Sequence, residues 1–171
     1  MNIFVLDRDP FEAAKMHCDQ HVTKMILETA QLLSTEARRL GITDDRLYKS
    51  THVNHPCSVW LRDKPIHVDW LWRLTCSLGQ QHEIRFGTVH KSCCVALVAT
   101  SSIYKATGYR PVPLEQILEL DHALAMPDEF KDSDPVDAYR AYYRYKHQQW
   151  TIDKGKGMKY TKVEPPEWLN L

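Results

Sequence analysis

The sequence lacks the features of a membrane protein or of a disulfide-linked secreted protein. No run approaches the roughly 18 consecutive apolar residues of a membrane span, although 43% of the 171 residues are hydrophobic. The first ten residues, MNIFVLDRDP, lack the basic region and apolar stretch of a signal peptide. Five cysteines, with Cys93 and Cys94 adjacent, do not suit a disulfide framework. These absences predict a soluble, cytoplasmic, single-domain protein with reduced thiols.

The chain also carries no net charge, which argues against a protein that simply coats nucleic acid. The charges are nevertheless unevenly distributed along the sequence. Residues 112–137 contain eight acidic side chains and one basic side chain, whereas residues 138–163 contain seven basic side chains and one acidic side chain. The basic segment could contact phosphates, or it could pair with the acidic segment before it.

Start and stop signals predict one all-α domain spanning residues 1–171. Asp9-Pro10 and Asp134-Pro135 each combine an N-cap residue with a proline in the first helical turn. We expect about five helices, over residues 10–40, 56–63, 65–86, 89–104 and 135–150, and residues 114–124 could add another. A short extended N-terminus and an irregular, basic C-terminal tail complete the predicted compact fold.

A stripe of polar residues runs along the helix predicted for residues 10–40. At about 100° per residue, it comprises His17, His21, Lys24, Glu28, Gln31 and Thr35. One interpretation is a solvent face with an ordinary i,i+4 pair between Lys24 and Glu28. The other is a cleft wall, where partial burial shifts the pKa values of Glu28 and the histidines. Asp19 lies on the opposite side and is expected to face solvent or to pair elsewhere.

The two histidines also raise the question of a metal. His17 and His21 have the i,i+4 spacing that can hold zinc from one helix face, and His52, His55 and Cys57 could add ligands. However, the sequence has no HExxH motif and no paired CxxC motifs. We therefore expect no metal ion and no other cofactor.

A second polar cluster lies in THVNHPCSVWLR, residues 51–62, where a loop meets a helix. Asn54, His55 and Arg62 are placed where free backbone N–H groups favour a phosphate. Alternatively, Asn54 or His55 caps the helix that begins at Pro56. His90 and Lys91 repeat the pattern in weaker form at the next helix.

The last predicted helix, DAYRAYYRYKHQQW, combines aromatic and basic side chains. Such a mixture suits stacking on bases and binding to phosphates, although aromatic residues at helical spacing more often belong to a core. We expect at least half of these aromatic residues to be buried. Arg140, Tyr143, Arg144 and Lys146 remain candidate DNA contacts, and Tyr142 is expected to share a face with Lys146.

Three short motifs resemble the pyrimidine-dimer DNA glycosylase family, the small all-helical enzymes typified by phage endonuclease V. The first is Asp19-Gln20-His21 followed by Glu28, which is similar to the segment that holds the catalytic glutamate of the family. The second is Asn54-His55-Pro56 followed by Arg62. The third is a basic, aromatic C-terminal region that ends with Pro166 and Trp168. Chain length and helical character are also similar.

The resemblance implies base excision by an enzyme that flips a nucleotide out of the duplex. In the family, the N-terminal α-amine attacks the sugar C1′ atom and a glutamate assists, a role that falls here on Glu28. This chain departs from the family pattern because residue 2 is Asn, and an initiator Met is normally removed only before small residues. The α-amine of Met1 and the side chain of Lys24 are therefore alternative nucleophiles, and a water activated by Glu28 is a third.

These observations predict a monomeric DNA glycosylase that excises a modified or damaged pyrimidine from double-stranded DNA. We expect catalytic roles for Glu28, His21, Lys24 and Met1. The residues expected to contact substrate or DNA are His17, Gln31, Asn54, His55, Arg62, His90, Lys91, Arg140, Tyr143, Arg144 and Lys146. The alternatives are a phage enzyme that transfers groups onto thymines in DNA, a metal-dependent hydrolase and a non-catalytic DNA-binding protein.

Overall fold

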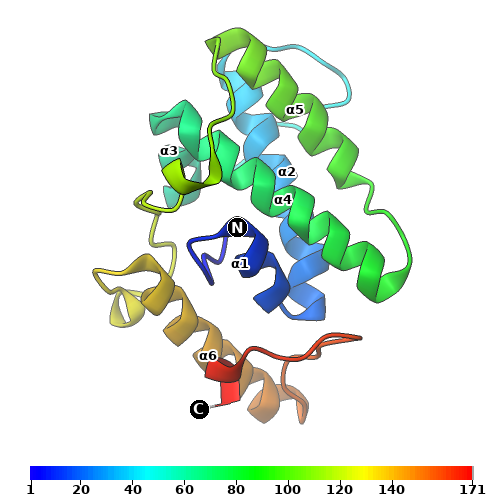
Figure 1. Cartoon of the computed structure of the whole chain (residues 1–171), viewed down its shortest axis with the longest axis vertical. Helices are drawn as coiled ribbons and strands as arrows, with labels where there is room; N and C mark the ends of the chain where they lie inside the picture. The colour runs from blue at the N-terminus through cyan, green and yellow to red at the C-terminus, as the bar shows by residue number, and fades with distance from the viewer. Residues whose placement is uncertain (171) are drawn as a thin grey trace.

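A computed structural model describes residues 1–170, and this part of the chain is all-helical (Figure 1). Its six α-helices are α1 (Pro10–Met16), α2 (Asp19–Arg39), α3 (Pro56–Asp63), α4 (Pro65–Phe86), α5 (Ser92–Thr107) and α6 (Pro135–Lys154). Short 3₁₀ turns occur at Leu114–Gln116, Asp128–Phe130 and Glu167–Asn170. The predicted all-α fold class is confirmed.

The prediction of one helix over residues 10–40 is wrong in one respect, because the helix is interrupted between α1 and α2. His17 and Cys18 both have extended backbone conformations. Groups from distant parts of the chain occupy the backbone atoms at the break. The Arg85 guanidinium donates to the carbonyl of His17 at 2.7 Å, and the Cys18 N–H donates to the Tyr143 hydroxyl at 2.9 Å. These tertiary hydrogen bonds replace the helical backbone hydrogen bonds that are missing at the interruption.

The other helix boundaries follow the local signals closely. Asp9 and Asp134 accept hydrogen bonds from the first turns of α1 and α6, as expected of N-cap residues. Gly87 ends α4 in the left-handed conformation. The helix expected at residues 89–104 instead spans Ser92–Thr107, and α6 continues past residue 150 to Lys154. Within 114–124, only the 3₁₀ turn at the start is helical.

The N-terminal segment before α1 is neither helix nor strand, and it lies in the core of the molecule. In Figure 1 it runs through the middle of the molecule, with α5 at one end and α6 with the C-terminal tail at the other. Helix α2 packs against α4 and α5, and α1 packs against α4. Ile3, Phe4, Val5 and Leu6 are all buried. The Phe4 ring packs against Tyr139, Tyr142 and Tyr143 of α6.

Ion pairs join α6 and the segment before it to the N-terminal segment. Arg8 pairs with Asp134 at 2.7 Å, and Arg140 pairs with Asp7 at 3.2 Å. Among residues 1–170, no ion pair joins the acidic segment 112–137 to the basic segment 138–163. The acidic segment therefore does not neutralise the basic segment through direct ion pairs. None of the helices in this part of the chain is both long and apolar enough to cross a membrane.

Candidate functional site

A pocket of about 190 Å³ brings together the four residues expected to act in catalysis. It lies where the N-terminal segment, α2, the segment before α6 and α6 meet. Its lining consists of Met1, Asn2, Phe4, His21, Lys24, Met25, Glu28, Ala125, Tyr142 and Lys146. We call it the Glu28 pocket. Tyr142 and Lys146, expected to share a face of the last helix, both contribute to it.

Glu28 is the acidic residue of this lining, and it is held by groups from two segments. The N–H of Asn2 donates to its Oε2 atom at 2.7 Å, and the Met1 amine lies 3.8 Å from the same atom. The Lys24 ammonium lies 3.5 Å from Oε1. Although Glu28 is only 7% exposed, its charge is thus compensated by two amines and a backbone donor. With Lys146 added, the lining carries an excess of positive charge.

Asn2 fixes the N-terminal segment against the pocket. Its Oδ1 atom accepts from the N–H groups of Ile3 and Phe4, and its Nδ2 atom donates to the carbonyl of Ala125 at 2.9 Å. Phe4 consequently has a φ of 36°, a left-handed conformation that costs a residue with a side chain about 1–2 kcal/mol. The ring of Phe4 then stacks on His21, with a centroid separation of 4.6 Å. The backbone strain thus places an aromatic wall beside Glu28.

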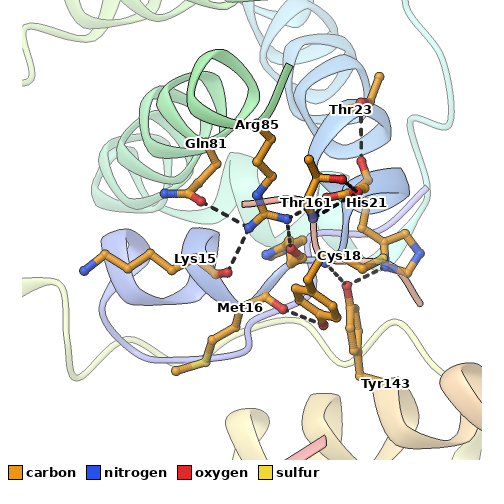
Figure 2. A network of polar contacts seen from close by, with 12 residues as sticks. Lys15, Met16, Cys18, His21, Thr23, Gln81, Arg85, Tyr143 and Thr161 are labelled. Carbon is orange, nitrogen blue, oxygen red and sulfur yellow. Dashed lines mark hydrogen bonds and ion pairs between the residues drawn. The ribbon is translucent and has the colours of Figure 1, made fainter. Parts of the chain in front are cut away.

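His21 connects the pocket to the interior of the molecule. Its Nδ1 atom and the Tyr143 hydroxyl are 2.8 Å apart (Figure 2). Burial lowers the pKa of His21 well below its usual value, and the positive charges of Lys146 and Lys24 lower it further. The ring therefore stays neutral at neutral pH, and it does not carry a positive charge into the pocket.

The burial of its side chains distinguishes the two interpretations of the polar stripe on α2. Glu28, His21 and Thr35 are buried, Gln31 is half-buried, and only Lys24 is exposed. The stripe is therefore not an ordinary solvent face. His21, Lys24 and Glu28 of the stripe line one side of the Glu28 pocket, as the cleft interpretation requires. Asp19, on the other side of α2, pairs with Arg85.

His17 does not belong to the stripe, because it precedes the break and is fully buried. Its Nδ1–H donates to the carbonyl of Ala13 at 2.7 Å, and burial lowers its pKa to about 4. The expectation that His17 contacts substrate or phosphate is therefore wrong. For the same reason, His17 and His21 do not form the continuous helical i,i+4 face that could hold zinc.

In the second cluster, His55 caps α3 by accepting from the N–H of Cys57 at 3.2 Å. Burial and the charge of the N-terminus lower the pKa of His55, and Glu28 opposes this shift. His55 does not line the Glu28 pocket. Asn54 and Arg62 are exposed and line two adjoining hollows, one of about 130 Å³ against α2 and one of about 700 Å³ over α3. They are accessible to a ligand, whereas Gln31 lines neither hollow.

The candidate DNA contacts on α6 fall into different environments. Tyr143 is fully buried, so the expectation that it touches DNA is wrong. Arg144 donates to the carbonyl of Trp168 at 3.4 Å, and Arg140 lies over the Trp168 ring while it pairs with Asp7. Both arginines thus hold neighbouring segments in place. Lys146 reaches the pocket, with its ammonium 5.0 Å from the centre of the Tyr142 ring.

His90 and Lys91 lie just before α5 and do not line the Glu28 pocket. The Nδ1 atom of His90 accepts from the N–H of Ser92, so His90 supports the start of the helix. Burial lowers its pKa. Lys91 is exposed.

Sequence reasoning missed a buried network around Arg85 (Figure 2). Its guanidinium donates to the carbonyls of Lys15 and His17, and to the side chains of Asp19 and Gln81. Asp19 also accepts from the N–H and the hydroxyl of Thr161, which attaches the C-terminal tail to the start of α2. The i,i+4 spacing of Gln81 and Arg85 on a largely apolar helix was the signal available in the sequence.

The sequence also contained no signal that Asn2 and Phe4 line the pocket, because their positions depend on tertiary contacts.

Within residues 1–170, no group of three or more His, Cys, Asp or Glu side chains is arranged to hold a metal ion. Comparisons with models of protein families, with curated proteins and with solved structures found no match to this chain.

Proposed function

We propose that this protein is a DNA glycosylase that excises a modified or damaged pyrimidine base, with Glu28 as its central catalytic residue. One observation carries the proposal: a buried carboxylate lies beside two primary amines in a pocket with an aromatic wall. Glu28 is 3.8 Å from the Met1 amine and 3.5 Å from the Lys24 ammonium. An acid–base group next to an amine nucleophile is the arrangement that covalent catalysis at a sugar carbon requires.

The proposed reaction begins when Glu28 accepts a proton from one of the two amines. The amine nitrogen attacks C1′ of the extruded nucleotide, and the bond between C1′ and the base breaks with its electron pair leaving on the base, which then takes up a proton. The resulting N-glycosylamine can open when its C1′–O4′ bond breaks and O4′ takes up a proton, which gives an imine between the protein and the sugar. Glu28 passes the proton it has accepted to the departing base, and the restored carboxylate then stabilises the positive charge that remains on the protein-bound sugar.

The surroundings of Glu28 suit an extruded nucleotide. The buried ring of Phe4 supports the pocket wall, and the partly exposed ring of Tyr142 lines the pocket, where an aromatic face can stack on a flipped base. Lys24 and Lys146 at the pocket, and Arg62 in the hollow over α3, supply positive charge for a DNA backbone. Asn54, exposed beside Arg62, adds an uncharged polar contact.

The decisive experiment incubates the protein with unmodified, ultraviolet-irradiated and hypermodified duplex DNA and measures free base and abasic sites. Glu28→Gln is expected to abolish base release while the protein remains folded. Asp69→Asn is a control, because Asp69 is also a buried carboxylate that pairs with a basic side chain, Arg73, but it lines neither the Glu28 pocket nor the two hollows at Arg62. The control is expected to keep its activity.

Borohydride trapping in the same assay identifies the nucleophile. A covalent adduct lost in Lys24→Gln assigns the amine to Lys24, and one lost when two residues are added before Met1 assigns it to the α-amine. Base release without any adduct assigns the attack to a water activated by Glu28. The proposal is overturned if no DNA yields free base or abasic sites, and a base that is altered but still attached to its sugar would indicate group transfer instead.

A further inference from the structure

The hydrogen bonds around Tyr143 determine which nitrogen of His21 carries a proton. A backbone N–H can only donate, so the Tyr143 oxygen accepts from Cys18 at 2.9 Å. The hydroxyl proton is then left for another acceptor, and an imidazole nitrogen accepts better than the neutral phenol oxygen of the neighbouring Tyr160. The Nδ1 atom of His21, at 2.8 Å, is a far better acceptor than the neighbouring Cys18 thiol. Tyr160 uses its own hydroxyl proton to donate to the carbonyl of Met16.

This arrangement makes Nδ1 of His21 an acceptor. Because the ring is neutral, its one proton then lies on Nε2, on the side of the ring away from Tyr143. His21 also lines the Glu28 pocket. The pocket therefore contains a neutral N–H donor whose position is fixed by a buried helix, next to the charged side chains of Lys24 and Lys146.

The charge balance of the pocket indicates what this donor would meet. Three cationic groups, the Met1 amine, Lys24 and Lys146, line it together with a single carboxylate. Glu28 compensates for one of them, which leaves an excess of about two positive charges. A volume of about 190 Å³ exceeds the ~30 Å³ occupied by one water molecule several-fold. It is therefore large enough for a tetrahedral oxyanion.

We propose that the Glu28 pocket contains a subsite for a phosphate group, formed by the Nε2–H of neutral His21 together with Lys24 and Lys146, with Tyr143 as the positioning residue. This inference rests on the proposed function in one respect: in a glycosylase, the bound phosphate is the phosphodiester next to the extruded nucleotide. The subsite itself follows from the contacts of His21 and can be tested with inorganic phosphate alone.

Nitrogen-15 NMR of the histidine side chains tests the first step directly on the unmodified protein. His21 is expected to show the neutral Nε2–H tautomer at pH 7. Addition of millimolar phosphate is expected to shift the His21 Nε2–H signal. An Nδ1–H tautomer in the free protein, or a signal that phosphate leaves unchanged, would overturn the proposal.

Variants test the other members of the subsite. Lys146→Gln is expected to weaken phosphate binding about tenfold, the usual effect of removing one charge-assisted hydrogen bond, without changing the tautomer. The matched control is Lys154→Gln, because Lys154 lies on the same helix and also covers an aromatic ring, that of Trp150, but does not line the pocket. Equal phosphate affinity in the two variants would contradict the subsite.

Tyr143→Phe tests the positioning role. It removes the hydroxyl proton but keeps the ring, so His21 is expected to populate both tautomers and to bind phosphate more weakly. A purely structural role of Tyr143 would leave the tautomer unchanged.

Competition by a duplex oligonucleotide separates this inference from the proposed function. Displacement of phosphate by the duplex supports DNA as the ligand. Phosphate binding without displacement upholds the subsite but counts against a glycosylase.

Discussion

Buried neutral histidines are expected to make this protein unusually sensitive to mild acid. His17, His21 and His122 are all buried, and burial is the main reason that the pKa of each is lowered. The environment of His122 is the most extreme. Its ring lies 5.1 Å from that of Trp60 and 4.4 Å from that of Trp70, and neither of its nitrogens has a hydrogen-bond partner within residues 1–170.

The size of the effect follows from the pKa values. Burial lowers the pKa of His17 to about 4 and that of His122 to about 3, whereas a histidine in an unfolded chain titrates near 6.5. Below pH 6.5 the unfolded chain therefore binds protons that the folded chain does not, so stability falls as the pH falls. At pH 5, each of these two histidines is expected to lower the unfolding free energy by about 2 kcal/mol. A combined loss of about 4 kcal/mol is a large part of the ~5–15 kcal/mol of a typical domain.

Urea denaturation at pH 7.5 and pH 5 measures this effect, and His122→Phe isolates one contribution. The variant cannot bind the proton, so its loss of stability between the two pH values is expected to be about 2 kcal/mol smaller than that of the unmodified protein. At pH 7.5 it is expected to be at least as stable, because the substitution removes two buried polar atoms that have no partner. The exposed His52 provides the control in His52→Asn. If His122→Phe and the control depend on pH equally, the linkage argument is wrong.

Two further substitutions test how the segments around the pocket are held. Arg85→Met leaves Asp19 buried without its guanidinium partner and is expected to lower the unfolding free energy in urea by about 3–5 kcal/mol, whereas Arg46→Met at an exposed pair is expected to leave it unchanged. Asp134→Ala removes the cap of α6 and is expected to cost about 1–2 kcal/mol, measured by thermal unfolding. A cost for Arg85→Met no larger than that of Asp134→Ala would contradict the role assigned to the buried network.

Local signals in the sequence predicted the helices, and helical geometry predicted much of the pocket. Lys24, Glu28 and His21 lie within one uninterrupted helix, so their angular positions hold in the structure. His17 does not lie on the pocket side, because its predicted angular position assumed a continuous helix through residues 17 and 18. The groups that stabilise the break, Arg85 and Tyr143, are 68 and 125 residues away from their partners in the sequence. A periodic pattern contains no information about contacts at that separation.

The same limit explains why the N-terminal segment was not assigned to the pocket. An extended apolar start is compatible with many packing positions, and tertiary contacts such as those of Asn2 with Glu28 and Ala125 select one of them. Each of these contacts joins segments far apart in the chain. Composition and spacing could therefore identify Glu28 as unusual, but not the backbone donor that fixes its carboxylate.

The proposed phosphate subsite depends on helix α6, which lies in the C-terminal part of the chain. Tyr143 and Lys146 are three residues apart on this helix, one inside the molecule and one at the pocket, so a single element sets both the tautomer of His21 and much of the charge around it. The position of α6 is fixed by its ion pairs with the N-terminal segment. A shift of α6 would therefore remove the phosphate subsite before it disturbed Glu28, which is held by Asn2 and Lys24. Variants that loosen α6 are thus expected to lose phosphate affinity while they keep the contacts of the carboxylate.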